Sequence, residues 1–311
     1  MKLYRSLKNI NTLKNSVVSI GMFDGVHLGH ATVINRVIAI AKEKNIKSII
    51  ITFSNSPVSY FSKDVIDLQI TNTKEKIALF RKTQLDYLFV IEFNEYIANL
   101  IPSTFMNDIL ISLFKVSYMV FGYDNHFGKN REGTFKYITE NFKEIHAELI
   151  IASKKDKITI SSTRIKEEIV NGNIINANKL LGHSFKISGK VVKGMQLGRK
   201  LGFPTANMAY EKNEKILPKN GVYFTLTKIK NTEYVSITNI GIKPSVQESN
   251  SISIETHILD FNQSIYGRNI SIKFIDRIRD EIKFNHINDL IDQITKDVTT
   301  IRKLNSLNIT T

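Results

Sequence analysis

Two histidines spaced three residues apart are the first residues in this chain whose types and spacing suggest chemistry. His27 and His30 lie in segment 21–30, G-M-F-D-G-V-H-L-G-H, together with Gly25 and Gly29. Histidines at positions i and i+3 share one face of a helix, and glycines allow a ligand to approach the backbone closely. Two imidazoles beside helix-end amides can stabilise charge that develops on a phosphoryl group. The segment therefore predicts a phosphate site.

The same spacing has simpler explanations. His27 and His30 would also suit a partly exposed helix in which Gly25 only forms a turn, and spacing alone does not choose between the two interpretations. A metal site is less well supported, because two histidines with Asp24 as the nearby acidic residue make an incomplete ligand set.

A second glycine-containing loop carries positive charge and ends in small polar residues. Segment 198–207 reads G-R-K-L-G-F-P-T-A-N. Its glycines stand beside Arg199 and could admit a phosphate group, and the side-chain oxygens of Thr205 and Asn207 could help to hold Mg²⁺. The loop matches neither a Walker A motif nor a dinucleotide-binding fingerprint. Taken alone, it could equally be a surface turn at Pro204.

The first half of the chain predicts an α/β domain that positions segment 21–30. An apolar run, Val17 to Ile20, stops at Gly21, and a helical pattern follows from His27 to Ala41. Further apolar runs and helical stretches alternate in the same way, which is typical of a parallel sheet covered on both faces. The strands are expected at 48–53, 87–93, 118–121 and 147–151, and the helices at 74–82 and 103–114. Segment 21–30 then lies where a strand hands over to a helix, which is where such sheets bind phosphates.

The second half predicts a small antiparallel β-barrel. A helix over 163–170 ends at Asn171 and Gly172, and a second helix ends at Leu181 and Gly182. Short alternating strands follow, and an amphipathic helix over 287–304 has the spacing to pack on a barrel. The strands are expected at 186–192, 221–228, 234–240, 253–259 and 269–274. We therefore predict domains at 1–183 and 184–311.

Composition limits the classes of function. A chain of 311 residues exceeds the usual size of one hydrophobic core, and its 42% hydrophobic and 23% charged residues are those of a globular protein. The formal charge of +14 comes from lysines spread along the whole length, so we expect a Lys-rich surface and no nucleic-acid partner. The chain has no cysteine, and its longest apolar runs are too short to span a bilayer. We expect a soluble, untargeted cytoplasmic protein without a membrane partner.

Two motifs in the first half carry a resemblance to a known family. Segment 21–30 resembles the G-x-F-D-x-x-H-x-G-H signature of bacterial FAD synthetase nucleotidyltransferases, and segment 160–166, I-S-S-T-R-I-K, resembles their I-S-S-T-x-I-R motif. Taken alone, Ser162 and Thr163 would suit a plain helix N-cap. The resemblance implies a Rossmann-like fold with His27 and His30 as catalytic residues. It also implies ATP and phosphate contacts from Gly21, Phe23, Asp24, Gly29, Ser162, Thr163 and Lys166.

This half departs from the family pattern at two places. Lys166 stands where the family usually has Arg, which keeps the charge but loses the bidentate fork. Segment 121–128 keeps Asp124 and Phe127, to which the resemblance gives flavin contacts, but Asn125 and His126 replace an aromatic residue and an arginine.

The second half resembles riboflavin kinases. The P-T-A-N tetrapeptide at 204–207 is followed in family order by landmarks at 218–223, 239–244, 255–261, 266–267 and 278–284. The resemblance implies that Glu255 is the base that activates the ribityl hydroxyl, although a Glu in a strand is more often simply solvated. It also implies ATP contacts from Gly198, Arg199 and Gly202, an Mg²⁺ site at Thr205 and Asn207, and flavin contacts from Arg279 and Phe284. Arg279 would equally suit a surface ion pair.

The two resemblances together imply a bifunctional flavin cofactor synthase. One half would phosphorylate riboflavin to FMN, and the other would adenylylate FMN to FAD with release of pyrophosphate, with ATP and Mg²⁺ used in both steps. The small-molecule partners would be riboflavin, FMN, FAD and ATP, and a weak homo-oligomer is compatible with the sequence. The alternative is a riboflavin kinase with a degraded adenylyltransferase domain. A basic nucleic-acid-binding protein would need a clustered basic face with interleaved aromatic residues, which the sequence lacks.

Overall fold

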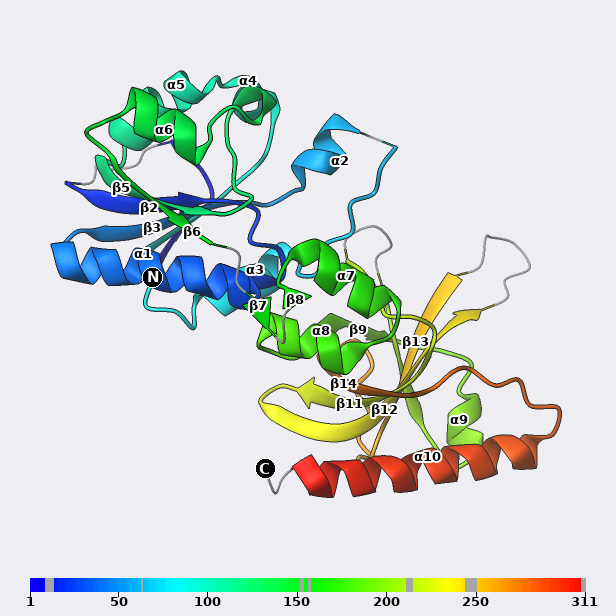
Figure 1. Ribbon diagram of the computed structural model, residues 1–311. Helices are drawn as coiled ribbons and strands as arrows, with labels where there is room; N and C mark the ends of the chain where they lie inside the picture. Colours follow the sequence, from blue (N-terminus) through cyan, green and yellow to red (C-terminus); the bar gives the residue numbers. More distant parts are fainter. Residues whose placement is uncertain are drawn as a thin grey trace. The chain divides into compact units, whose positions relative to one another are not determined.

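The computed structural model describes residues 1–8, 14–62, 64–151, 154–155, 158–210, 215–243 and 251–308. Contacts between residues divide the chain into a first unit, 1–164 with 213–215, and a second unit, 165–212 with 216–311 (Figure 1). The position 183/184, which we predict as the domain boundary, is two residues past the end of α8 (Ile174–Leu181). That helix groups with the second unit because it packs against the barrel strand β14 (Asn269–Arg279), where the Asn178 amide donates to the Phe274 carbonyl at 2.9 Å.

The first unit is built on a parallel sheet, as expected, but the sheet has six strands, of which β1 (Lys2–Tyr4) was not expected from the sequence. Its strand order is β1-β4-β3-β2-β5-β6. Because β2 lies between β3 and β5, the strand order reverses beside it, and ligands bind in such sheets at the carboxyl ends of the strands at that reversal. The strands are β1 (Lys2–Tyr4), β2 (Ser16–Ile20), β3 (Lys47–Phe53), β4 (Tyr87–Ile91), β5 (Val116–Gly122) and β6 (His146–Ile150).

Helices cover both faces of this sheet. One hydrophobic cluster joins the sheet to α1 and α3, and a second joins its other face to a stretch over 105–114 that includes the π-helical turn η2. The wider turn of η2 aligns positions i, i+4 and i+5, so Phe105, Ile109 and Leu110 are buried together. The elements are η1 (Asp24–Val26), α1 (Leu28–Lys44), α2 (Pro57–Phe61), α3 (Thr73–Phe80), α4 (Glu95–Asn99), α5 (Pro102–Thr104), η2 (Phe105–Ile111), η3 (Lys129–Arg131), α6 (Phe135–Asn141) and the pair β7 (Lys154–Lys155) and β8 (Ile158–Thr159).

The second unit is a closed antiparallel barrel followed by a helix, which confirms the expected fold class. The strand order around the barrel is β10-β13-β12-β11-β14-β9. A short strand, β10, was not expected from the sequence. The elements are α7 (Ser162–Val170), α8, β9 (Lys186–Val192), α9 (Leu197–Lys200), β10 (Thr205–Met208), β11 (Gly221–Ile229), β12 (Thr232–Lys243), β13 (Ser251–Ile258), β14 (Asn269–Arg279) and α10 (Ile287–Asn308).

The barrel encloses a ladder of hydroxyl groups. Thr225 contacts both Ser236 and Thr238 at 2.8 Å, Ser236 continues to Thr227 at 2.8 Å, and Thr238 continues to Thr256 at 3.0 Å. All five side chains are fully buried. Each hydroxyl can donate one bond and accept others, so the ladder satisfies its members without water or charge.

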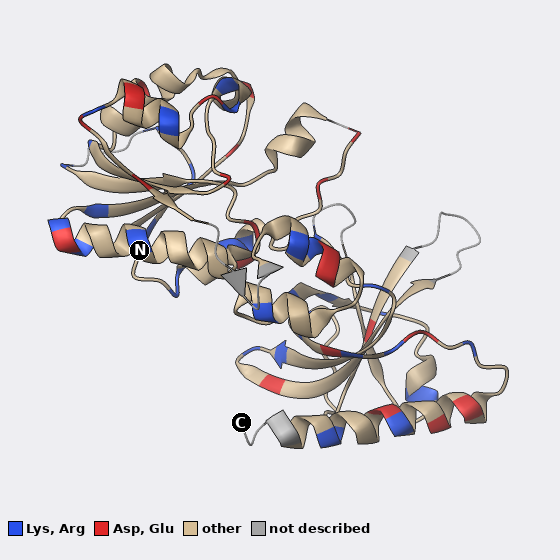
Figure 2. Cartoon of the chain, in the orientation of Figure 1, with Lys and Arg blue, Asp and Glu red and all other residues tan. Residues whose placement is uncertain are grey.

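The basic residues that the structure describes do not collect on one part of the fold. Figure 2 shows Lys and Arg on helices and strands of both units, with Asp and Glu interspersed among them along α10. This distribution agrees with a generally Lys-rich surface and gives no support to a dedicated nucleic-acid interface.

Candidate active sites

In the first unit, the polypeptide turns between β2 and α1 so that two imidazole rings lie face to face. His27 is the N-cap of α1, and its Nδ1 accepts a hydrogen bond from the backbone N–H of His30 at 3.2 Å. The two rings are stacked, with centroids 3.5 Å apart and an angle of 15° between their planes. An Nδ1 atom that accepts a hydrogen bond carries no proton, so His27 has its ring proton on Nε2.

The environment of this pair keeps His30 uncharged. Burial lowers the pKa of His30 well below its usual value of 6.5, and the nearby His27 and Lys76 lower it further. Within the described ranges, His30 Nδ1 is buried without a hydrogen-bond partner. His30 therefore offers a ligand a neutral imidazole instead of an imidazolium charge.

A small cavity of about 100 Å³ lies at the carboxyl end of the sheet, where Gly122 ends β5 and Ile150 ends β6. Six of the residues expected at the phosphate and flavin sites line it: His27, Gly29, His30, Asp124, Ser162 and Thr163. The N-terminus of α1 is at this cavity and so is that of α7, and the Ser162 hydroxyl donates to the Asp24 carbonyl at 3.1 Å. Two helix N-termini, whose free amides and dipoles favour anions, thus meet at one small cavity.

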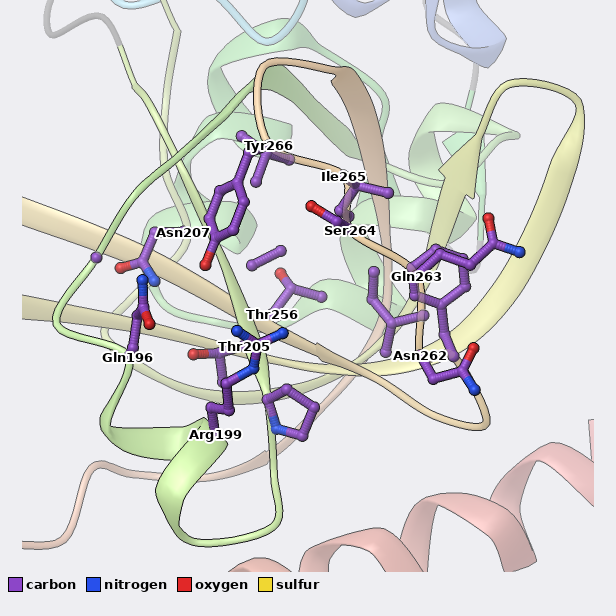
Figure 3. A pocket seen from close by; sticks show the side chains of 16 residues that line it. Gln196, Arg199, Thr205, Asn207, Thr256, Asn262, Gln263, Ser264, Ile265 and Tyr266 are labelled. Carbon is purple, nitrogen blue, oxygen red and sulfur yellow. The ribbon is translucent and has the colours of Figure 1, made fainter.

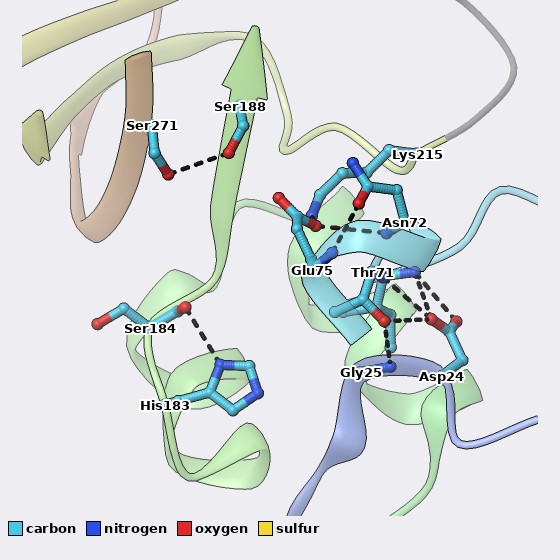
Figure 4. A network of polar contacts seen from close by, with 11 residues as sticks. Asp24, Gly25, Thr71, Asn72, Glu75, His183, Ser184, Ser188, Lys215 and Ser271 are labelled. Carbon is cyan, nitrogen blue, oxygen red and sulfur yellow. Dashed lines mark hydrogen bonds and ion pairs between the residues drawn. The ribbon is translucent and has the colours of Figure 1, made fainter. Parts of the chain in front are cut away.

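Two other residues expected at this site, Asp24 and Phe23, are buried beneath the turn and hold its shape. The Asp24 carboxylate, which is buried, accepts hydrogen bonds from the backbone N–H groups of Ile70 and Thr71 at 2.9 to 3.0 Å (Figure 4). The Phe23 ring, also buried, packs between His30 and Phe80, at centroid distances of 5.1 and 5.7 Å. Neither side chain lines the cavity, so both act on the shape of the turn.

Three further residues from the sequence motifs lie outside this cavity. Gly21 precedes the turn, beside the Asn125 side chain, which donates to the Ile20 carbonyl. Phe127 belongs to the hydrophobic core, with its ring 5.2 Å from that of Phe105. Lys166 lies one turn into α7 and groups with the second unit.

The second unit has a larger cavity, of about 280 Å³, beside β10 (Figure 3). Arg199, to which the resemblance gives an ATP contact, and Thr205 and Asn207, the expected Mg²⁺ ligands, line it. Thr205 and Asn207 are two positions apart on one strand, so their side chains point to the same side of the barrel wall. The lining also includes Gln196, Asn262 and Gln263, which sequence reasoning did not single out. Thr256 and Tyr266, which it treated only as parts of the landmarks at 255–261 and 266–267, line the cavity too.

Close backbone approaches shape this cavity. A Cβ atom on Gly194 would lie 2.4 Å from the amide nitrogen of Asn207, so only glycine fits there without displacing that side chain. Similarly, a Cβ on Gly198 would lie 2.4 Å from the Phe203 carbonyl oxygen, and Gly202 has a φ of +86°. Gly198 and Gly202 do not line the cavity, but they permit the tight turn that presents Arg199.

Glu255 lies in the barrel wall between two asparagines. It is directly opposite Asn207 on β10 and Asn239 on β12. Side chains of directly opposite residues stand on the same face of a sheet, so both amides flank the half-buried carboxylate. The Asn239 amide also donates to the Glu281 carboxylate at 3.1 Å. Sequence reasoning treated Asn239 only as part of the landmark at 239–244, whose last residue, Pro244, lies outside the described residues.

Of the two residues expected at the flavin in this unit, Arg279 ends the barrel strand β14 and Phe284 follows that strand. The Arg279 guanidinium contacts both carboxylate oxygens of Asp297 on α10, at 2.7 to 3.1 Å, and Gln293 donates to the same carboxylate at 2.9 Å. Asp297 is 4% exposed, so this ion pair fastens α10 to β14. Phe284 is half-buried in the segment between β14 and α10. Neither residue lines the cavity.

The donor set of this cavity suits Mg²⁺. No group of three or more His, Asp or Glu side chains with metal-site geometry occurs among the described residues. The hydroxyl of Thr205 and the amide oxygen of Asn207 are hard oxygen ligands, and Mg²⁺ usually takes one or two protein ligands together with water and phosphate oxygens. The two side chains therefore fit a nucleotide-bound Mg²⁺.

A doubly wound sheet with a small cavity at two helix N-termini, and a closed barrel with a polar cavity, are the architecture of a two-domain, nucleotide-using transferase. The FAD synthetase family model matches residues 9–164, and the riboflavin kinase family model matches residues 181–305. The chain belongs to the family of bifunctional riboflavin kinase/FMN adenylyltransferases.

Relatives of this name match along nearly the whole chain. The protein from Buchnera aphidicola subsp. Schizaphis graminum is 36% identical and covers 97% of this chain and 98% of its own length. The protein from Bacillus subtilis is 38% identical and covers 91% of this chain and 90% of its own length. Among solved structures, the chain is similar to one described as a macrolide-efflux protein from Streptococcus pneumoniae. The two sequences are 30% identical, the match covers 97% of this chain and 98% of the other, and the TM-score is 0.88. No helix in the described part of the present chain has the length and apolar character needed to cross a membrane.

Proposed function

We propose that the two reactions of this family use separate groups of residues in this chain. The second unit transfers the γ-phosphoryl group of ATP to riboflavin, and the first unit transfers the AMP moiety of a second ATP to the FMN so formed. The observation that carries this proposal is that each unit has its own cavity, lined by residues from its own family motif. The kinase-only alternative is not favoured, because the first unit retains both histidines and matches the FAD synthetase model.

In the kinase reaction, Glu255 accepts the proton of the ribityl hydroxyl as the hydroxyl oxygen attacks the γ-phosphorus. The bond to the β-phosphate oxygen breaks, and ADP leaves. Asn207 and Asn239 flank the carboxylate and orient it. Arg199, at the rim of the cavity, supplies positive charge to the phosphates, and Arg279 and Phe284 belong to the segment that we assign to the flavin.

In the adenylyltransferase reaction, an oxygen of the FMN phosphate attacks the α-phosphorus of ATP, and pyrophosphate leaves. His27, through its Nε2–H, and His30 stabilise the charge that develops on the α-phosphate oxygens. Gly29 and the N-terminus of α7, with Ser162 and Thr163, bind the remaining phosphates. We assign Lys166 to the same phosphates and Asp124 to the flavin side of the cavity.

Mg²⁺ would be held by Thr205 and Asn207 together with the ATP phosphates, where it would neutralise phosphate charge during transfer. Because both reactions consume ATP, we place the chain in the cytoplasm. The substrates and products are riboflavin, FMN, FAD and ATP.

Incubation of the purified chain with riboflavin and Mg²⁺-ATP, followed by chromatography, tests this function. We expect FMN to appear first and FAD later, and we expect chelation of Mg²⁺ to suppress FMN formation. FMN without FAD, even when FMN is supplied directly, would support the kinase-only alternative. Formation of neither product would contradict both.

A further inference from the structure

The turn between β2 and α1 is held in an unfavourable backbone conformation. Phe23 and Val26 have φ angles of +48° and +42°, in the left-handed region that side chains other than glycine rarely adopt. Val26 is β-branched, for which this region is especially costly, at about 1–3 kcal/mol per residue. Such a turn keeps its shape only if surrounding contacts over-determine it. The contacts that do so lie behind the turn, away from the cavity.

Two buried charged side chains brace the turn. Asp24 ties it to the backbone of Ile70 and Thr71, as described above. The second is Lys76 on α3, which is 3% exposed and whose Nζ donates to the carbonyls of Met22 and Phe53 at 2.7 and 3.1 Å. Met22 lies inside the turn and Phe53 ends β3, so one ammonium group joins the turn to the neighbouring strand.

A buried lysine is an unusual residue for a purely structural contact, because its ammonium group carries a charge. Within the described ranges its hydrogen bonds go to carbonyl and hydroxyl oxygens and none goes to a carboxylate. A buried ammonium without a paired carboxylate is costly, and burial lowers the pKa of Lys76 from 10.5 to about 8. A neutral donor could make the same hydrogen bonds at lower cost. The retained charge therefore points to an electrostatic role.

We propose that Lys76 is a positioning residue for adenylyl transfer: it fixes the turn at Met22, and its positive charge adds to burial and to His27 in disfavouring a charge on the His30 imidazole. The inference rests on the role proposed above for His30. Because Lys76 does not line the cavity, it acts through the turn and through His30, without contact to the nucleotide.

The groups around His30 set the sign of this effect. His27 on the same turn and Lys76 on α3 both disfavour a positive charge on His30. Asp24 in the turn, with its carboxylate bonded to backbone amides, favours positive charge at Lys76. Asp124, which follows β5, is exposed at the cavity. Removal of Lys76 leaves the carboxylates in place, so the pKa of His30 is expected to rise.

Three variants of the full chain test the proposal. Lys76→Met removes the charge and the donors, Lys76→Gln keeps an amide donor without charge, and Lys74→Met is a matched control on the exposed side of α3. We expect Lys76→Met to lower kcat for FAD formation on the order of tenfold to a hundredfold, with a smaller change in KM for ATP. Riboflavin phosphorylation in the same preparation serves as the internal control. We expect its rate in each variant to stay within about twofold of the parental rate, because this reaction takes place in the other unit.

A titration separates the electrostatic role from a structural one. In NMR spectra of the Lys76→Met and Lys76→Gln proteins, we expect the His30 ring to titrate at higher pH than in the parent, whereas Lys74→Met leaves it unchanged. The proposal would be overturned if the Lys76→Met protein formed FAD with the parental kcat and its His30 ring titrated at the parental pH. A His30→Ala protein with full FAD formation would instead remove the proposed role of His30, and the titration result would still stand.

The unmodified protein provides a test that does not depend on folding of the variants. Because Lys76 loses its proton with a pKa of about 8, the His30 ring signals should show a second inflection near that pH in the parent. A flat His30 signal across this range would show that Lys76 exerts no field on the imidazole and would overturn the proposal even if Lys76→Met failed to fold.

Discussion

Glu255 on β13 lies directly opposite Asn207 on β10, so the proposed base of the kinase reaction stands beside a proposed ligand of Mg²⁺. We predict that Glu255→Gln lowers the rate of FMN formation on the order of a hundredfold or more, because the amide keeps the shape but cannot accept the proton. FAD formation from supplied FMN should be unchanged, since it takes place in the other unit. Rates of both reactions in one preparation measure this.

Glu233→Gln is a suitable control, because Glu233 also lies on the barrel wall but pairs with Lys273. It should leave both rates at the parental level. A Glu255→Gln protein that phosphorylates riboflavin within a few-fold of the parent would show that another group is the base.

The stacked histidines give a second prediction. His30→Ala should reduce kcat for FAD formation on the order of a hundredfold, with a smaller effect on KM, because the contact is made in the transition state. His146→Ala provides the control, since His146 is exposed on β6 and stacks on Tyr118 at 4.8 Å. Steady-state kinetics with FMN and ATP distinguish the variants. Equal rates for His30→Ala and parent would exclude His30 from the mechanism.

The ion pair between Arg279 and Asp297 predicts a loss of stability. Asp297→Asn should lower the free energy of unfolding of the second unit by about 2–3 kcal/mol, because the largely buried Arg279 charge keeps no carboxylate partner. Asp292→Asn, at an exposed position of the same helix, should change it little. Urea unfolding of the full chain, followed through barrel amides by hydrogen exchange, would compare them. Identical unfolding of the two variants would argue against a stabilising role.

The local sequence predicted the central strands of the sheet well, for a physical reason. Strands buried on both faces must be continuously apolar, so β2 and β3 are visible without tertiary information. By contrast, β10 follows a proline and spans four residues of mixed character, and its pairing with β13 arises from barrel closure. The hydroxyl ladder could not be predicted either. Thr225 and Thr238 are ordinary residues for a strand, and only closure of the barrel buries them together.

The motifs identified which residues gather at each site but not which of them line its cavity. Asp24 and His27 belong to one motif, yet the first bonds backbone amides behind the turn and the second lines the cavity. Their side chains diverge because Gly25 intervenes in a left-handed conformation. Lys76 had no sequence signal at all, since a lysine in an amphipathic helix is usually solvated and only packing shows that this one is buried.

The buried Lys76 also makes stability depend on alkaline pH. Its pKa is about 8 in the folded protein and 10.5 in an exposed lysine, so between these values the unfolded chain binds a proton that the folded chain lacks. The free energy of unfolding of the first unit should therefore rise with pH across this range, by up to about 3 kcal/mol at roughly 1.4 kcal/mol per pH unit. Lys76→Met should abolish this rise, and Lys74→Met should retain it. Urea unfolding at several pH values, followed through amides of β2 and β3, measures the dependence. Parallel stability curves for the parent and Lys76→Met would show that the Lys76 ammonium is solvated in the folded protein and would remove the basis for its electrostatic role.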